Sequence, residues 1–202
     1  MQVQRLRAIN KSRFQVLLDN GVAFVLYKGE INRFKIREDD ILSDAVYKAI
    51  MEEILPKRCR LRGLNLIAAR PYTTYKLKEK LTEGGYPESI ITDAIDYFKS
   101  IGVLDDYRYA VNYITLNSSR KSKKRIATDL TVKGIDKDIV KNALDEVISD
   151  GDATDETEVI KRLAKKRHFD PETATYEERQ KLIAYLYNKG FEYDKIVNSI
   201  KE

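Results

Sequence analysis

The stretch "LTVKGIDKDIV", residues 130–140, occurs three times in this chain in slightly altered form. The other two copies read "LTEGGYPESII", from residue 81, and "LYNKGFEYDKI", from residue 186. Each copy has a leucine four residues before a glycine and a large apolar or aromatic residue directly after it. The three glycines are separated by 49 and 56 residues. A period of about 50 residues predicts a tandem array of one supersecondary unit.

The repeated glycine predicts the end of a helix. Apolar residues recur at intervals of four before and after it, and this spacing is typical of a helix face. A glycine just beyond a helix adopts left-handed backbone angles that a side chain disfavours. In such a cap, the residue four before the glycine contacts the residue after it. The predicted contacts are Leu81 with Tyr86, Leu130 with Ile135, and Leu186 with Phe191.

A further helix is expected before each of these helix pairs. The first runs from about Lys57 to Arg70, the second follows "LDD" at 104–106, and the third is "ETEVIKRLAKKRHF" at 156–169. "TYEE" at 175–178 is typical of a capping box. We therefore expect a mainly α fold with three tandem three-helix modules in an elongated array. The predicted modules are residues 56–103, 104–150 and 151–202; each is too small to be robust alone and gains stability from its neighbours.

The first 55 residues follow a different pattern. "RFQVLLDNGVAFVLYKGEINRFKI", residues 13–36, alternates apolar and polar residues around Asn20-Gly21, which predicts a β-hairpin. We expect a small antiparallel sheet and then a helix from about Asp40 to Leu55, ended by Pro56. The residues expected to line one face of the hairpin are Phe14, Val16, Leu18, Phe24 and Leu26. A run of seven acids in "ALDEVISDGDATDETE", residues 143–158, suggests a solvated linker between the second and third modules.

The composition limits which partners and which cellular compartment are expected for this protein. The 202 residues are 43% hydrophobic and 34% charged, with a net charge of +5 and a pI of about 9.0, which favours acidic partners such as nucleic acid. The single cysteine, Cys59, excludes an internal disulfide and favours a reducing compartment. The chain starts without the apolar core of a signal peptide and has no run of about 18 apolar residues. We expect a cytoplasmic protein that does not contact membranes.

The inventory of reactive residues does not favour an enzyme. The only histidine, His168, lies in a different module from Cys59, and no phosphate-binding glycine loop is present. We expect His168 to end a helix and Cys59 to be an inert, partly buried thiol. The carboxylate pairs Asp39-Asp40 and Asp105-Asp106 could hold a metal, but both precede expected helices, so we interpret them as N-caps. We therefore expect no catalytic residue, no metal and no cofactor.

Basic clusters are the candidate functional feature. Residues 57–80 contain eight Lys or Arg and one acid, residues 120–133 contain six and one, and residues 161–167 contain five and none. The pairs Lys161/Lys165, Arg162/Lys166 and Lys121/Arg125 are each four apart, so we expect each pair to share a helix face, where a polyanion would relieve repulsion. Plain solvated faces remain the alternative. The candidate binding residues are Lys57, Arg58, Arg60, Arg62, Arg70, Lys76, Lys80, Arg120, Lys121, Lys123, Lys124, Arg125, Lys161, Arg162, Lys165, Lys166 and Arg167.

Two longer stretches carry a family resemblance. "LIAARPYTTYKLKEKLTEGGYPESIITDAIDYFKSIGVLDDYRYAVNYI", residues 66–114, and "KSKKRIATDLTVKGI", residues 121–135, together resemble the RecX family of bacterial recombination regulators. The resemblance covers about residues 61–202 and is strongest in "GVLDDYRYA" and "RIATDLTVKGI". Ser122 departs from the family pattern, where glycine is frequent.

The resemblance implies a non-enzymatic protein of DNA recombination, DNA repair and the SOS response. Such a protein binds the RecA recombinase filament along its helical groove and inhibits strand exchange, ATP hydrolysis and co-protease activity. It would make non-specific contacts with single- and double-stranded DNA, and we expect it to be a monomer. Two other functions stay open. One is a sequence-specific DNA regulator built from helix-turn-helix-like modules, and the other is a scaffold for an unrelated protein.

Overall fold

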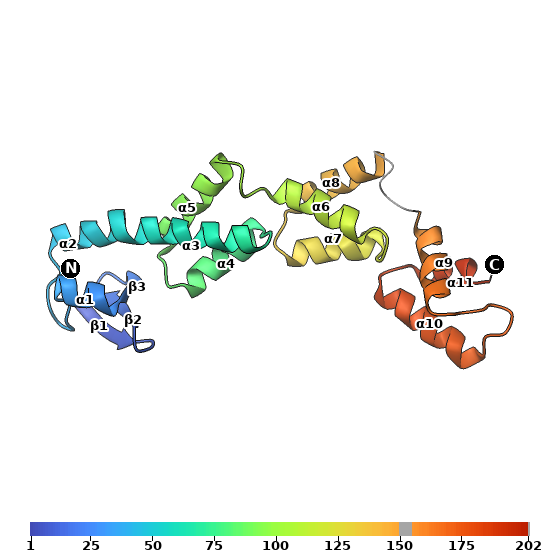
Figure 1. Cartoon of the computed structure of the whole chain (residues 1–202), viewed down its shortest axis with the longest axis horizontal. Coiled ribbons are helices and arrows are strands. Elements are labelled where there is room, and N and C mark those ends of the chain that lie inside the picture. Colours follow the sequence, from blue (N-terminus) through green and yellow to red (C-terminus); the bar gives the residue numbers. More distant parts are fainter. Residues whose placement is uncertain (150–154, 202) are drawn as a thin grey trace. The chain divides into compact units, whose positions relative to one another are not determined.

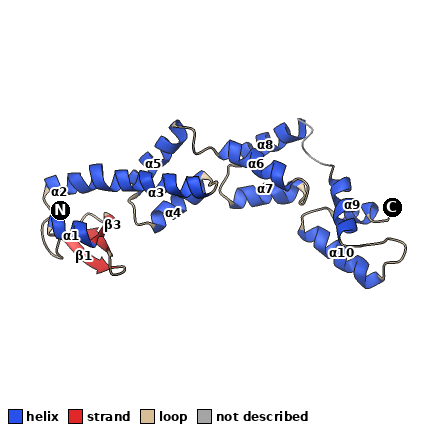
Figure 2. Ribbon diagram, viewed as in Figure 1, coloured by secondary structure: helices blue, strands red, loops and turns tan. Residues whose placement is uncertain are grey.

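The computed structural model describes residues 1–149 and 155–201, which form two compact units, Met1–Asp105 and Asp106–Glu202. The described chain is mainly helical, with one small sheet near the N-terminus (Figure 2). After the sheet come two short helices and a π-helical segment, and then three groups of three helices. The predicted fold class, a small antiparallel sheet followed by three-helix modules, is thereby confirmed.

The sheet of the first unit contains three antiparallel strands in the order β1-β2-β3: β1 (Val3–Ala8), β2 (Arg13–Leu18) and β3 (Ala23–Tyr27). Gly21 in the tight turn has a φ of +81°. Phe14 pairs with Leu26, and Val16 pairs with Phe24. Alternate side chains therefore meet on one buried face, as the hairpin pattern predicts.

The segment after the hairpin differs from the expectation in two ways. Residues 28–34 are helical (α1, Lys28–Phe34), although the hairpin prediction included them; Ile31 and Phe34 are three residues apart, which is the spacing of a helix face. Pro56 does not end a helix. Instead α2 (Asp44–Lys48), a π-helical segment (Ala49–Ile54) and α3 (Leu55–Ala69) run on without interruption (Figure 1). The N–H of Leu55 bonds Ile50 O, five residues back, and this wider turn accommodates a proline that has no N–H to donate.

The expected N-cap at Asp39-Asp40 is also wrong. Ser43 caps α2 by accepting a hydrogen bond from the Val46 N–H, and Asp39 lies in a left-handed turn with a φ of +67°. The other acidic pair lies at a helix start, because α6 (Asp106–Asn117) begins at its second residue.

The leader and the first module share one hydrophobic core. Helices α3, α4 (Thr74–Glu83) and α5 (Glu88–Ser100) bury Leu77, Leu81 and Phe98 against the apolar face of the sheet. The glycine turn after α4 touches the sheet directly, because Val25 N–H donates to Gly85 O at 3.2 Å. Arg13 adds a 2.8 Å hydrogen bond to Gly84 O.

The second unit holds two further groups of three helices, each with its own core. Its helices are α6, α7 (Lys123–Val132), α8 (Lys137–Ser149), α9 (Glu156–Lys166), α10 (Tyr176–Asn188) and α11 (Tyr193–Ser199). The predicted capping box is present, since Thr175 and Glu178 exchange hydrogen bonds at the start of α10. Much of the acidic run at 143–158 is helical, contrary to the expected linker, because α8 extends to Ser149 and α9 begins at Glu156. Residues 150–154 lie outside the described part.

All three repeated glycines have the predicted left-handed backbone angles. Gly85, Gly134 and Gly190 have φ values of +81°, +80° and +89°. After α7 the N–H of Ile135 bonds Leu130 O at 3.2 Å, and after α10 the N–H of Phe191 bonds Leu186 O at 3.3 Å. These are the hydrogen bonds of a Schellman cap.

Candidate partner and nucleic-acid interface

Arg58, a candidate from the first basic cluster, is engaged within the fold. Its Nη2 lies 2.5 Å from Glu30 Oε1, and its Nη1 donates to Val25 O at 3.3 Å. The guanidinium also stacks over the Tyr27 ring, 4.6 Å from its centroid. With 17% of its side chain exposed, Arg58 ties α3 to the leader and has little surface for an external partner.

Lys121 is also paired internally. The expectation that it shares a helix face with Arg125 is wrong, because α7 begins at Lys123. Lys121 Nζ instead lies 2.6 Å from Asp129 Oδ2, and Arg125 Nε lies 3.2 Å from Asp129 Oδ1. The phenol of Tyr113 donates to the same carboxylate. One acid therefore relieves the repulsion for which the sequence suggested an external polyanion.

The titration of this cluster reflects that pairing. Burial favours the neutral form of Asp129, but hydrogen bonds from Lys121 and Tyr113 outweigh it, so the pKa of the carboxyl is lowered. Burial likewise opposes the charge on Lys121, but its hydrogen bonds to Asp129 and Tyr113 outweigh that effect and raise its pKa. Both groups stay charged across the neutral range.

Other cations are held loosely at the surface. Lys76 pairs with Glu79, and Lys80 pairs with Glu83, each at 2.6 Å across one helical turn. Such exposed pairs contribute little to stability, because water and salt screen them, so the lysines can bind another anion instead. Three arginines rest on tyrosine rings; they are Arg60 on Tyr97, Arg70 on Tyr72 and Arg167 on Tyr185.

The remaining candidates are exposed at the surface. Arg120 and Arg162 donate to backbone carbonyls, those of Leu116 and Ser119, and stay exposed. Lys161 is exposed on α9. Within residues 1–149 and 155–201, six candidates are exposed and form no ion pair, ring contact or side-chain hydrogen bond: Lys57, Arg62, Lys123, Lys124, Lys165 and Lys166. On α9 the pairs Lys161/Lys165 and Arg162/Lys166 share a helix face, as predicted.

Two arginines of the leader were missed. Arg5 and Arg7 alternate on β1, opposite Leu17 and Gln15 of β2, and both are exposed. The signal is present in the sequence, because the chain has four basic residues and no acid before Asp19. Counting charge along the hairpin as well as along the helices would have found them.

The two reactive residues, Cys59 and His168, have different surroundings. Cys59 is fully rather than partly buried, and its burial raises the pKa of the thiol to about 12, so the thiol stays protonated at neutral pH. His168 has a φ of +55° and follows the end of α9, as expected. No group of three or more His, Cys, Asp or Glu suited to a metal occurs in the part of the chain that the structure describes.

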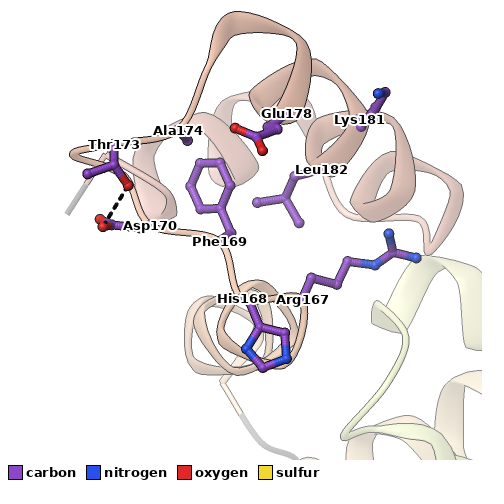
Figure 3. Close-up of a pocket in the computed structure, with 9 residues that line it drawn as sticks. All are labelled: Arg167, His168, Phe169, Asp170, Thr173, Ala174, Glu178, Lys181 and Leu182. Carbon is purple, nitrogen blue, oxygen red and sulfur yellow. Dashed lines mark hydrogen bonds between the residues drawn. The ribbon is translucent and has the colours of Figure 1, made fainter.

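A pocket of about 250 Å³ lies between α9 and α10, around His168 and Phe169 (Figure 3). Its two carboxylates are already bonded. Asp170 accepts from Glu172 N and from Thr173 Oγ1, and Glu178 accepts from Thr175. These hydrogen bonds lower the pKa of both carboxyls, and Figure 3 shows the His168 ring apart from them. The pocket therefore lacks a paired acid and base.

Three family models match the chain in order. They describe the first, second and third three-helix domains of RecX, and they match residues 59–98, 105–144 and 154–197. The regulatory protein RecX of Finegoldia magna is 30% identical over 186 residues, which cover 91% of this chain and 90% of that protein. The chain belongs to the RecX family.

Further comparisons agree with the RecX assignment. The regulatory protein RecX of Clostridium botulinum strain Eklund 17B is 30% identical over 196 residues, covering 96% of this chain and 91% of that protein. A crystal structure of regulatory protein RecX has a TM-score of 0.61 at 22% identity and covers 100% of this chain and 99% of its own. RecX from Lactobacillus salivarius has a TM-score of 0.58 at 26% identity, over 73% of this chain and 95% of its own.

The matched RecX domains include some of the exposed basic residues and exclude others. The free cations Lys124 and Lys165 lie within the second and third matched RecX domains, whereas Arg5 and Arg7 precede the first. None of the described helices has the length and hydropathy needed to span a bilayer.

Proposed function

We propose that this protein is a non-enzymatic cytoplasmic modulator of the RecA recombinase filament that inhibits strand exchange, ATP hydrolysis and co-protease activity. The observation that carries the proposal is the presence of all three RecX domains, in order, in one chain. The monomer would contact both the recombinase and DNA.

The charge distribution supports the DNA part of the proposal. Exposed cations without an internal carboxylate occur on α3, α7 and α9, one helix of each module. Lysines and arginines that contact phosphates bind any sequence and give strong salt dependence. We infer non-specific contacts with the backbone of single- and double-stranded DNA, rather than recognition of base edges.

Co-sedimentation with RecA filaments on single-stranded DNA tests the proposal. The protein is expected to pellet with filaments formed in the presence of a non-hydrolysable ATP analogue, and to pellet less with the same DNA alone. A competition between random duplexes separates this function from that of a sequence-reading regulator. A strong preference for one duplex, with no binding to the filament, would overturn the proposal.

A further inference from the structure

A shallow apolar groove crosses the second module between α7 and α8. It encloses about 570 Å³ and lies entirely within one module. Its lining residues are spaced by three, four, seven and eight positions along each helix, so one face of α7 and one face of α8 form its two walls. These residues are Lys124, Ala127, Thr128, Thr131 and Val132 on α7, and Lys137, Val140, Lys141, Leu144, Asp145 and Ile148 on α8.

The groove presents carbon rather than polar atoms. Val132 is 72% exposed and Ile148 is 42% exposed, one on each wall. The hydroxyls of Thr128 and Thr131 already donate hydrogen bonds to the backbone of their own helix, so they do not require a polar group from a ligand. Large exposed apolar residues on both walls of a groove indicate an interaction site.

The fold does not require these apolar residues. The repeat offset of 49 residues makes Glu83 and Lys99 the counterparts of Val132 and Ile148 in the first module. Both counterparts are exposed, and Glu83 pairs with Lys80. The same helix pair is therefore built with charged residues at these two positions in the first module and with apolar residues in the second.

The charged residues at the rim of the groove indicate that the partner is acidic. Lys124, Lys137 and Lys141 border the groove, against the single acid Asp145. None of the three lysines forms an ion pair within the described ranges. Helix-in-groove binding places an apolar stripe in the groove and charged flanks against the rim. With 10 and 13 residues, α7 and α8 give walls of about 15–20 Å, the length of three to four helical turns.

We propose that the α7–α8 groove binds an amphipathic helix of a protein partner, with an apolar stripe flanked by acidic residues. The inference deepens the proposed function, on which it rests: the helix belongs to the recombinase. The second module thus contacts protein through this groove, and its other basic residues are left for DNA.

The test exchanges the two apolar residues for those of the first module. The variant V132E/I148K is expected to need at least tenfold more protein for half-maximal inhibition of RecA ATP hydrolysis, with an unchanged Tm. The matched control is Leu116→Glu, because Leu116 is 68% exposed on α6 of the same module but does not line the groove. Wild-type potency in V132E/I148K, or an equal loss in L116E, would overturn the inference. If the wild-type protein did not inhibit RecA ATP hydrolysis, the proposed function itself would be wrong.

A photo-crosslinking amino acid at position 132 identifies the occupant. With RecA filaments on single-stranded DNA, the expected product joins this position to a helical RecA segment that carries at least two acids. A product with DNA or with a second copy of this chain would overturn the inference, as would the absence of a product when the labelled protein still inhibits. The charge reversal K124E/K141E is expected to weaken inhibition, and stronger inhibition would exclude an acidic partner.

Discussion

The carboxylate of Glu156 accepts a 2.9 Å hydrogen bond from the backbone N–H of Lys123, and so joins the third module to the start of α7. Its other oxygen lies 2.8 Å from Lys195 Nζ, and only 15% of the side chain is exposed. A second contact reinforces the first, because the N–H of Ser122 donates to Lys189 O at 3.1 Å. Modules two and three are therefore expected to unfold together.

Replacing Glu156 with alanine should weaken that joint. The loss of a charged acceptor for Lys123 and Lys195 is expected to lower the free energy of unfolding by about 1–3 kcal/mol. Urea denaturation of the full chain measures the effect. The control is Glu158→Ala, which removes an exposed acid from the same first turn of α9. Equal stability of the two variants would mean that the Glu156 contacts contribute nothing.

The glycine turn of the third module packs directly on the second. A Cβ at Gly190 would lie 2.6 Å from Arg125 Cβ and 2.6 Å from Ser122 Oγ. Gly190→Ala therefore combines left-handed strain with a steric clash, at about 2–5 kcal/mol. Gly102→Ala is the control, because it has a φ of +70° and an added Cβ meets nothing within 4 Å. It is expected to cost about 1–2 kcal/mol by strain alone. Equal costs in the two variants would contradict the contact.

Because of Asp129, the free energy of unfolding of the second module should depend on pH in the acid range. Because its folded pKa is lowered, its contribution is complete above the ordinary value of 3.8 and is lost as pH falls through the lowered pKa. Asp129→Asn is expected to cost about 1–2 kcal/mol at neutral pH. The difference from wild type should shrink as the pH is lowered below 3.8, as followed by thermal unfolding. A difference that stays constant down to acid pH would refute the ion-pair explanation.

The unpaired lysines of α9 should carry DNA affinity. Lys165→Ala with Lys166→Ala is expected to reduce the slope of log K against log salt by about 1–2 units on single-stranded or duplex DNA. The control removes two exposed lysines of the first unit, Lys28 and Lys48, which lie outside the basic clusters. Fluorescence anisotropy over a range of salt gives both slopes. Identical slopes for the two double variants would remove the basis for placing DNA on α9.

Much of the fold could be read from the sequence because its signals are local. The glycine turns at Gly134 and Gly190 need only a glycine and helical spacing on both sides, and Asn20-Gly21 marks the hairpin within a few residues. Pro56 was misread because a π-type turn, which has no sequence signature, accommodates it. The hairpin prediction extended through α1, although Ile31 and Phe34 have the three-residue spacing of a helix face.

The candidate site was less predictable because pairing depends on tertiary contacts. Lys121 meets Asp129, eight positions later, only because the chain turns at Ser122 before α7 begins. The contact of Arg58 with Glu30 joins segments 28 residues apart, so nothing near Arg58 in the sequence marks it as structural. In contrast, an alignment of the repeats places Val132 at the position of Glu83. An apolar residue where the first module has a charged one is a signal for the groove that the sequence alone contains.

ATP hydrolysis by RecA on single-stranded DNA, followed as this protein is added, tests the central claim most directly. We expect the rate to fall in proportion to the protein added and to approach a low plateau at saturation. The same titration with V132E/I148K should be displaced to higher concentrations. A hydrolysis rate that stays unchanged at saturating wild-type protein would contradict the proposal that this chain modulates the RecA filament.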